Sequence, residues 1–451
     1  MNQEFSVAKF GGTSVADHQA MMRCADIIAA DSHVRIVVVS ASAGVTNHLV
    51  ALCQSKLDDE QREQHINGVI AIQLNILEYV SLDADLAHGF ENTLNAFRSA
   101  ASKAVQTNAQ RDELLSFGER LSSYLFTQVL RDKAVNATRF DVRSVLKTDS
   151  QFAKANPDIA QTRTRAQAEL VPLLSEHVVV TQGFIASDEY GDTTTLGRGG
   201  SDYSAALIAE ATGANSIYIW TDVVGIYSTD PRVCEKARPI AHLTFDEAAE
   251  MATFGAKVLH PATILPAARS SIGVFVGSSK DPQGGGTWIE KVPSADIIAG
   301  VRAVTQRKNQ ILLTLKSPEM LLASGFLARV FTILSEYKIS VDLVTTSEIS
   351  VAVTLDNAPN ASRPELDQEA LDRLGEFCHV TVENNLALVG LIGSEIQLRQ
   401  SELNLMKVLS GFDIRLICHG ASKHNLCFLV DQSQSDDVVR AIHQQLLEQD
   451  Q

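Results

Sequence analysis

Long apolar runs, a basic N-terminal leader and paired cysteines are all missing from this chain of 451 residues. No apolar stretch is long enough to cross a bilayer, which excludes a membrane-spanning helix and a membrane partner. Residues 1–9, MNQEFSVAK, lack the basic start and apolar core of a secretory signal. We therefore expect the protein to stay in the cytoplasm.

The cysteines are few and scattered, and none stands in a Cys-x-x-Cys pair. This pattern predicts reduced and mostly buried thiols, and it predicts no structural zinc site. The six positions are Cys24, Cys53, Cys234, Cys378, Cys418 and Cys427.

An excess of basic residues is also missing, because the formal net charge is −16. Nucleic-acid surfaces need clustered lysine and arginine to displace counterions from phosphates, so we expect no nucleic-acid partner. If an acidic protein binds a phosphorylated ligand, it must gather a few cations locally against its overall field.

A chain of this length is expected to form two or three domains. Between residues 5 and 279, apolar strand-like runs at 34–40, 177–184 and 216–222 alternate with helical stretches, which is typical of an α/β fold with a largely parallel buried sheet. Residues 57–132 have no strand pattern and predict a helical insertion. The glycine-rich residues 280–287, KDPQGGGT, end the alternation.

The C-terminal part of the sequence contains two copies of one pattern. Residues 309–383 predict strand, helix, strand, strand, helix and strand, and residues 385–451 repeat this order without the last strand. Because a missing edge strand would expose unpaired backbone, we infer that residues 297–304 supply it. The predicted division is a domain at 1–292, a ferredoxin-like βαββαβ module at 308–384, and a second such module made of 297–304 plus 385–451, with the first nested inside the second.

Lys9 precedes Gly11 and Gly12 in the stretch KFGGTS, where the first strand ends. Glycines let backbone N–H groups approach an anion and the lysine adds a charge, so the stretch could bind phosphate. It is neither a P-loop nor a dinucleotide-binding turn, and a simple tight turn is the ordinary alternative.

Three further stretches combine glycine, hydroxyl and charged residues at strand ends, where open α/β sheets bind ligands: SASAGVTN at 40–47, TLGRGGSD at 195–202 and TDVVGIYSTDPR at 221–232.

Arg198 stands between glycines, and Ser201 and Asp202 open a predicted helix that ends at Gly213. A guanidinium fork beside free N–H groups at a positive helix end favours an anionic ligand. A solvated turn before a capped helix is the alternative. Lys257, in FGAKVLHP, adds a further candidate phosphate ligand, although a lysine on such a turn is usually solvated.

Six segments in order and spacing resemble those of the aspartokinases, in the amino-acid kinase superfamily: KFGGTSV, SASAGVTN, LSFGERLSS, TTTLGRGGSDYSA, WTDVVGIYSTDPR and EMATFGAKVLHP. The paired C-terminal modules resemble the nested ACT modules of that family. The segment from GFLARVF to VAVTLD is most similar to the lysine-sensitive, single-function class. The chain stops at Gln451, so we expect no homoserine dehydrogenase domain. Val224 replaces a proline that is usual in the family.

The resemblance implies a three-layer αβα catalytic domain that transfers the γ-phosphoryl group of ATP, with Mg²⁺ carried by the ATP phosphates, to the side chain of L-aspartate. The product would be 4-phospho-L-aspartate, in the first step of lysine, threonine and methionine biosynthesis. The substrate carboxylate has a pKa of about 4 and needs no general base. Catalysis would then consist of positioning and of neutralising repulsion between anions.

Roles follow from the resemblance, residue by residue. Lys9, Asp202 and Lys257 would be catalytic, and Asp202 has an equally good alternative as a helix N-cap. Arg198 would bind the α-carboxylate of aspartate and Glu119 its ammonium, although a helical glutamate is normally solvated. The remaining aspartate-binding residues would be Ser40, Thr46 and Ser201. The ATP-binding residues would be Gly11, Gly12, Thr221, Asp222, Tyr227, Arg232, Lys257 and Val258.

The resemblance also implies inhibition by L-lysine and a homodimer or tetramer joined through the ACT modules. Asp342 and Glu348 lie near a strand pair, and two carboxylates could bind a cationic amine. The implied lysine site comprises Met320, Phe326, Leu327, Ser340, Val341, Asp342, Thr346, Ser347 and Glu348. Three alternatives stay open: a kinase for another small carboxylate amino acid, a non-catalytic amino-acid sensor, and modules that only dimerise the enzyme.

Overall fold

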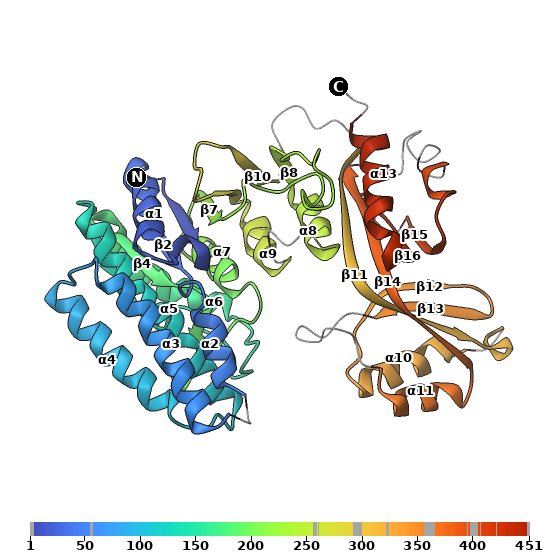
Figure 1. Cartoon of the computed structure of the whole chain (residues 1–451), viewed down its shortest axis with the longest axis horizontal. Coiled ribbons are helices and arrows are strands. Elements are labelled where there is room, and N and C mark those ends of the chain that lie inside the picture. The colour runs from blue at the N-terminus through green and yellow to red at the C-terminus, as the bar shows by residue number, and fades with distance from the viewer. Residues whose placement is uncertain are drawn as a thin grey trace. The chain divides into compact units, whose positions relative to one another are not determined.

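The computed structural model describes residues 4–54, 57–255, 259, 261–291, 300–321, 324–355, 366–394, 396, 405, 407–420 and 422–448. The chain forms two compact units (Figure 1). The first unit comprises Met1–Ile226, Pro239–Ala249 and Lys257–Ser294, and the second comprises Tyr227–Arg238, Glu250–Ala256 and Ala295–Gln451. Two short segments that the sequence analysis assigned to the first domain thus belong to the second unit.

The first unit is built on an eight-stranded sheet with the order β3-β4-β2-β1-β7-β9-β10-β8. All neighbours are parallel except β9 and β10, so the predicted α/β class with a largely parallel sheet is confirmed. The strands are β1 (Ser6–Phe10), β2 (Val34–Val39), β3 (Ala137–Arg139), β4 (Val178–Gln182), β7 (Ser216–Thr221), β8 (His242–Thr244), β9 (Gly273–Ser278) and β10 (Gly286–Glu290), with a separate hairpin of β5 (Ile185–Ser187) and β6 (Thr193–Thr195).

Helices cover both faces of this sheet. One apolar core joins the sheet to α1 (His18–Ala30), α2 (Val45–Leu52), α3 (Asp59–Leu77), α4 (Ala84–Ala101) and α5 (Asn108–Asp132). The last three of these form the predicted helical insertion and lie side by side in Figure 1. The other helices are α6 (Ile159–Arg165), α7 (Gly200–Thr212), α8 (Phe245–Thr253) and α9 (Pro261–Ser270). Local signals define several ends: α7 stops at the left-handed Gly213 (φ 79°), and Thr244 and Glu247 form the expected capping box of α8.

The second unit has one six-stranded antiparallel sheet with the order β12-β13-β11-β14-β16-β15. Its strands are β11 (Gly300–Lys316), β12 (Val341–Thr346), β13 (Ser350–Leu355), β14 (His379–Ser394), β15 (Ile414–His419) and β16 (Asn425–Asp431). Two separate apolar cores form on it. One contains α10 (Phe326–Glu336) and α11 (Gln368–Gly375), and the other contains α13 (Ser435–Leu447).

The two long strands β11 and β14 run through both halves of this sheet, whereas the sequence analysis divided each of them between two modules (Figure 1). Residues 300–307 pair with 388–394, which is the edge pairing that a nested arrangement requires. The register shifts near residue 309, and Asn309 (φ 61°) and Asn385 (φ 59°) both have left-handed backbone. Asparagine tolerates left-handed backbone better than most residues, so each strand can continue past the asparagine where its pairing is irregular. The exact division into modules stays a prediction.

Among the described residues, no helix is both long enough and apolar enough to pass through a bilayer.

Candidate active site

The carboxyl ends of β4, β2, β1 and β7 meet at one edge of the parallel sheet. Backbone hydrogen bonds join the loops that follow them: the Ser40 N–H donates to the Phe10 carbonyl (3.1 Å), the Ala43 N–H to the Gly12 carbonyl (3.1 Å), and the Gly11 N–H to the Trp220 carbonyl (3.1 Å). The motifs KFGGTS, SASAGVTN and TDVVGIY, which are far apart in sequence, are therefore adjacent in space.

Two glycines permit the close packing at this edge. A Cβ atom on Gly12 would lie 2.9 Å from the Ala41 carbonyl oxygen, and one on Gly118 would lie 2.6 Å from the Ala41 Cβ. Both distances are shorter than carbon atoms tolerate without movement of the neighbour. Gly118 thus lets α5 pack directly against the loop at Ala41, and this brings the next residue, Glu119, to the site.

Lys9 is buried near the end of β1 and forms an ion pair with Asp202. Asp202 lies in the first turn of α7, whose N-cap is Gly199 in a left-handed conformation without a side-chain cap. The alternative interpretation of Asp202 as an N-cap is therefore wrong. Its carboxylate instead holds the lysine ammonium in place, and the pair lies where the motif loops converge.

Glu119 is only 6% exposed, although it lies in the middle of a helix. Burial raises the pKa of its carboxyl to about 8, against smaller lowering effects of the Ala41 N–H and the Lys9 charge. The expectation of a solvated helical glutamate is wrong here. A buried carboxyl with a strongly raised pKa, facing a cation, is typical of a ligand-binding site.

Asp112, which the sequence analysis missed, attaches the loop before α7 to α5. Its fully buried carboxylate accepts hydrogen bonds from the Ala153 N–H (2.8 Å), the Thr195 N–H (2.9 Å) and the Thr195 hydroxyl (3.0 Å). Burial raises the pKa of the Asp112 carboxyl above its usual value, although the three hydrogen-bond donors act in the opposite direction. No local pattern could have identified Asp112, because Thr195 lies 83 residues away.

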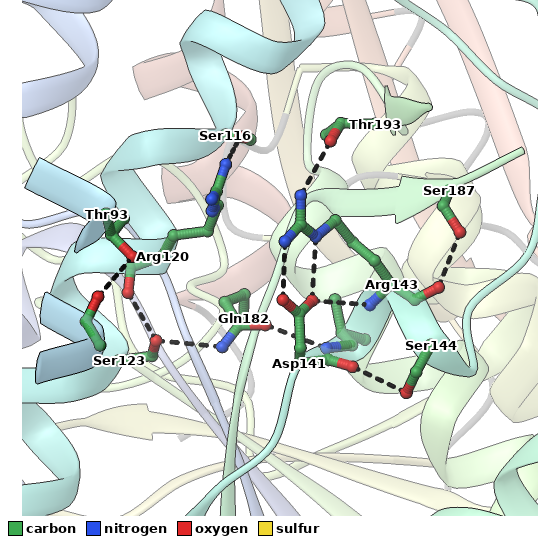
Figure 2. Close-up of polar contacts among 12 residues, drawn as sticks. Thr93, Ser116, Arg120, Ser123, Asp141, Arg143, Ser144, Gln182, Ser187 and Thr193 are labelled. Carbon is green, nitrogen blue, oxygen red and sulfur yellow. Dashed lines mark hydrogen bonds and ion pairs between the residues drawn. The ribbon is translucent and has the colours of Figure 1, made fainter. Parts of the chain in front are cut away.

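A second polar network, drawn in Figure 2, fixes α5 against β4 and the loop after β3. The Gln182 side chain donates to the Ser123 hydroxyl (3.0 Å) of α5 and accepts from the Val142 N–H (3.0 Å). Beside it, Arg143 binds Asp141 through two nitrogens at 2.9 and 2.7 Å. Burial would raise the pKa of Asp141, but the guanidinium lowers it to about 2. Through Gln182, the helix that carries Glu119 is thus attached to β4 and to the loop after β3.

The other residues predicted to bind aspartate lie on loops and helix ends of the same unit. Ser40 is half-buried after β2, and its carbonyl accepts a hydrogen bond from the Ser122 hydroxyl (2.7 Å). Thr46 is exposed on α2, and Arg198 is exposed in the loop before α7. Ser201, in the first turn of α7, packs closely against Gly183, which follows β4. A Cβ atom added to Gly183 would lie 2.6 Å from the Ser201 Cβ.

Thr221 is the last residue of β7 and Asp222 follows it at the same edge, with the Thr221 hydroxyl 3.2 Å from the Asp222 carboxylate. The Thr221 carbonyl accepts from the Ser279 N–H at 2.8 Å, so the ends of β7 and β9 are joined. Tyr227 and Arg232 belong to the second unit, where Arg232 is exposed and pairs with Asp230 at 2.6 Å. Lys257 and Val258 lie outside the described residues.

The residues expected to bind lysine lie in the second unit, on α10, on β12 and in the adjoining turns. Phe326 and Leu327 begin α10, and Met320, Phe326 and Val341 pack against one apolar core. Asp342 forms an ion pair with Arg307 of β11, whereas Glu348 is exposed. The remaining members are on β12 or beside it: Ser340, Thr346 and Ser347, the last with its hydroxyl 2.7 Å from that of Ser350.

Comparison with known proteins shows two matches to families. The profile of the Amino acid kinase family matches residues 4–278, and that of an ACT domain matches residues 403–446. The chain is also 51% identical to lysine-sensitive aspartokinase 3 of Escherichia coli (strain K12) over 451 residues, which cover 99% of this chain and 100% of that protein.

Two solved structures of E. coli aspartokinase III are similar to this one, each at 50% identity. The complex with aspartate and ADP (R-state) superimposes with a TM-score of 0.88 and covers 98% of this chain and 100% of that chain. The complex with lysine and aspartate (T-state) has a TM-score of 0.82, with 99% and 100% covered.

Proposed function

The chain belongs to the aspartokinases of the amino acid kinase family, and from this premise we propose that the loops at the carboxyl edge of its parallel sheet are where MgATP phosphorylates L-aspartate. The observation that carries the assignment is the buried Lys9–Asp202 ion pair beside Glu119, whose pKa is raised to about 8. The ADP and aspartate bound by the similar E. coli enzyme support the choice of substrates.

Lys9 stabilises the transferring phosphoryl group. The aspartate carboxylate is already ionised at neutral pH, so the barrier comes from bringing one anion to another and not from removing a proton. A buried ammonium acts strongly there because little water screens it. Asp202 positions the ammonium, and Mg²⁺ enters as part of the MgATP substrate.

Glu119 and Arg198 bind the two charged ends of the aspartate backbone. An incoming ammonium favours ionised Glu119, so the desolvation that raises its pKa without a ligand is offset by the new ion pair. Arg198, on the loop that Asp112 holds, offers a planar fork for the α-carboxylate. Ser40, Thr46 and Ser201 complete the aspartate pocket.

The nucleotide lies on the β1 and β7 side of the edge. Gly11 and Gly12 let the phosphates approach the backbone closely. The Gly11 N–H itself donates to the Trp220 carbonyl, so the Gly12 N–H is the one assigned to phosphate. Thr221, the last residue of β7, and Asp222 lie beside them. Tyr227, Arg232, Lys257 and Val258 are assigned to ATP from the family resemblance alone.

Lysine inhibits the enzyme by binding beside β12. The lysine bound by the similar E. coli enzyme supports this assignment. Glu348 is exposed, and Asp342 is engaged by Arg307, so an incoming ammonium would compete with that guanidinium for the Asp342 carboxylate. The site comprises Met320, Phe326, Leu327, Ser340, Val341, Asp342, Thr346, Ser347 and Glu348.

The ACT modules join two chains into a homodimer, and two dimers can form a tetramer. Within the described residues, β12 and β15 are the outer strands of the six-stranded sheet. Outer strands present unpaired backbone groups, which a second chain can cover. We place this assembly in the cytoplasm, as the sequence analysis does.

One assay tests the function and its alternatives. ADP release is measured with L-aspartate or L-glutamate as acceptor, with and without L-lysine. Release that depends on aspartate and falls with lysine is expected. Preference for glutamate would favour a different carboxylate kinase, and no release with either acceptor would favour a non-catalytic sensor. Activity that ignores lysine would leave the modules a dimerising role.

A further inference from the structure

Three metal-ligating side chains meet in the second unit, apart from the residues assigned above. They are Cys234, in the segment Tyr227–Arg238, His443 of α13, and Glu448 directly after it. The sulfur, an imidazole nitrogen and a carboxylate oxygen all lie within 4.8 Å of one another. His443 is 1% exposed and Cys234 is 7% exposed, so the cluster is not a set of solvated surface groups.

The two distances from His443 Nδ1 to its neighbours are close to the edges of a zinc tetrahedron. His443 Nδ1 lies 3.6 Å from Cys234 Sγ and 3.1 Å from Glu448 Oε1. Zinc bonds of about 2.3 Å to sulfur and about 2.0–2.1 Å to nitrogen or oxygen, at tetrahedral angles, separate these ligand pairs by about 3.5 and 3.3 Å. The third pair, the Cys234 sulfur and a Glu448 carboxylate oxygen, lies within 4.8 Å, so small side-chain rotations can bring all three atoms onto one ion.

Ser228 lies where an outer partner of a metal-bound histidine is expected. Its hydroxyl is 2.9 Å from His443 Nε2 and accepts the Arg238 N–H at 3.1 Å. A metal on Nδ1 keeps the ring proton on Nε2, and the Ser228 oxygen can accept a hydrogen bond from this N–H group. Such outer hydrogen bonds orient metal-bound imidazoles in proteins.

The scaffold around the cluster is already assembled by other contacts. Arg440 donates to the Val233 carbonyl (3.3 Å), Arg238 donates to the Leu447 carbonyl (3.0 Å), and Lys236 pairs with Glu448 Oε2 (2.6 Å). These contacts hold the segment with Cys234 against the end of α13. The ligands thus need little ordering when a metal binds, which favours affinity.

A simpler interpretation is that His443 donates its Nδ1 proton to the Glu448 carboxylate. That proton can be shared with the Cys234 sulfur in a three-centre hydrogen bond, whereas a metal ion on Nδ1 accepts all three side chains as ligands, and metal titration distinguishes the two arrangements. A thiolate and a carboxylate together also neutralise the charge of a divalent cation.

We propose that Cys234, His443 and Glu448 bind one zinc ion, which fastens the segment Tyr227–Arg238 to α13. The sequence predicts no zinc site, because its cysteines are scattered and lack a Cys-x-x-Cys pair. Cys234 and His443 are 209 residues apart, so only the folded chain brings them together.

Cobalt(II) substitution tests the proposal on the full-length protein, because a thiolate bound to Co²⁺ gives a charge-transfer band in the near ultraviolet. The protein is stripped of metal with a chelator and titrated anaerobically with Co²⁺, and then with Zn²⁺. We expect the band to saturate at one Co²⁺ per chain and to disappear on addition of one equivalent of Zn²⁺. No saturable band in the wild-type protein would overturn the proposal.

Variants locate the ion. Cys234→Ser should abolish the band, Glu448→Gln should weaken Zn²⁺ binding at least tenfold, and Ser228→Ala should weaken it by about 10–100-fold. Cys418→Ser is the matched control, since Cys418 belongs to the same unit but not to the cluster, and it should keep the band. Circular dichroism checks that each variant is folded. A band that survives in folded Cys234→Ser, unchanged affinity in Glu448→Gln, or loss of the band in Cys418→Ser would each refute the proposed ligands.

Discussion

The raised pKa of Glu119 makes the affinity for L-aspartate depend on pH. If only ionised Glu119 attracts the substrate ammonium, the apparent affinity is proportional to the fraction of Glu119 that is ionised. A pKa of about 8 without ligand leaves half of the carboxyls ionised at pH 8 and roughly 1% at pH 6.

The sign and size of the effect follow from these fractions. Protonation at low pH removes the partner of the ammonium, so binding should weaken as pH falls and level off above pH 8. The apparent dissociation constant should therefore be about 50-fold larger at pH 6 than at pH 8. Near pH 7, binding should release close to one proton, because the ligand returns Glu119 to its ionised form.

Isothermal titration calorimetry of aspartate binding, in buffers with different ionisation enthalpies, measures both quantities. Glu119→Gln is the matched control, since it keeps the size of the side chain but cannot titrate. It should bind weakly and almost independently of pH, with no proton release. A wild-type affinity that does not change between pH 6 and 8, or an equal pH dependence in Glu119→Gln, would refute the assignment of Glu119 to the ammonium.

Three further predictions concern transition-state stabilisation, positioning and regulation. Lys9→Met should lower kcat by several orders of magnitude while ATP affinity stays within about tenfold, and near-normal kcat would contradict the role of Lys9. Asp112→Asn should raise the KM for aspartate about 10–100-fold, as we also expect for Arg198→Ala, because it loses charge-assisted hydrogen bonds; an equal rise in the KM for ATP would indicate general damage. Glu348→Gln should shift lysine inhibition to higher concentration at normal uninhibited activity, and it is a cleaner test than Asp342→Asn, which also removes the partner of Arg307. An unchanged inhibition midpoint would place the effector elsewhere.

Local sequence information was sufficient for the fold class. The spacing of apolar residues predicted a largely parallel sheet with a helical insertion, and both are present. Capping residues such as Thr244 and Glu247 act within one turn of helix, so their hydrogen bonds could be predicted from four consecutive residues. The motif loops also meet as expected, because parallel strands bring their carboxyl ends to one edge of the sheet.

The contacts that no local pattern reveals join distant residues. The continuity of β11 and β14 depends on how each strand pairs with the other, and the irregularities at Asn309 and Asn385 look like strand ends in a linear sequence. Asp202 likewise has cap-like spacing, and only the folded chain shows that Gly199 is the N-cap of α7 and that Asp202 pairs with Lys9.

The sequence by itself determined the order of strands and helices and the identity of the charged residues, because these depend on local spacing and residue type. Only the tertiary structure decided which of those residues are buried and what each one faces. Glu119 looks like any surface glutamate until α5 packs against the loop at Ala41. Cys234 and His443 look unrelated until α13 meets the segment Tyr227–Arg238. Burial and charge pairing control pKa and ligand affinity, and both arise from packing between parts of the chain that no local pattern connects.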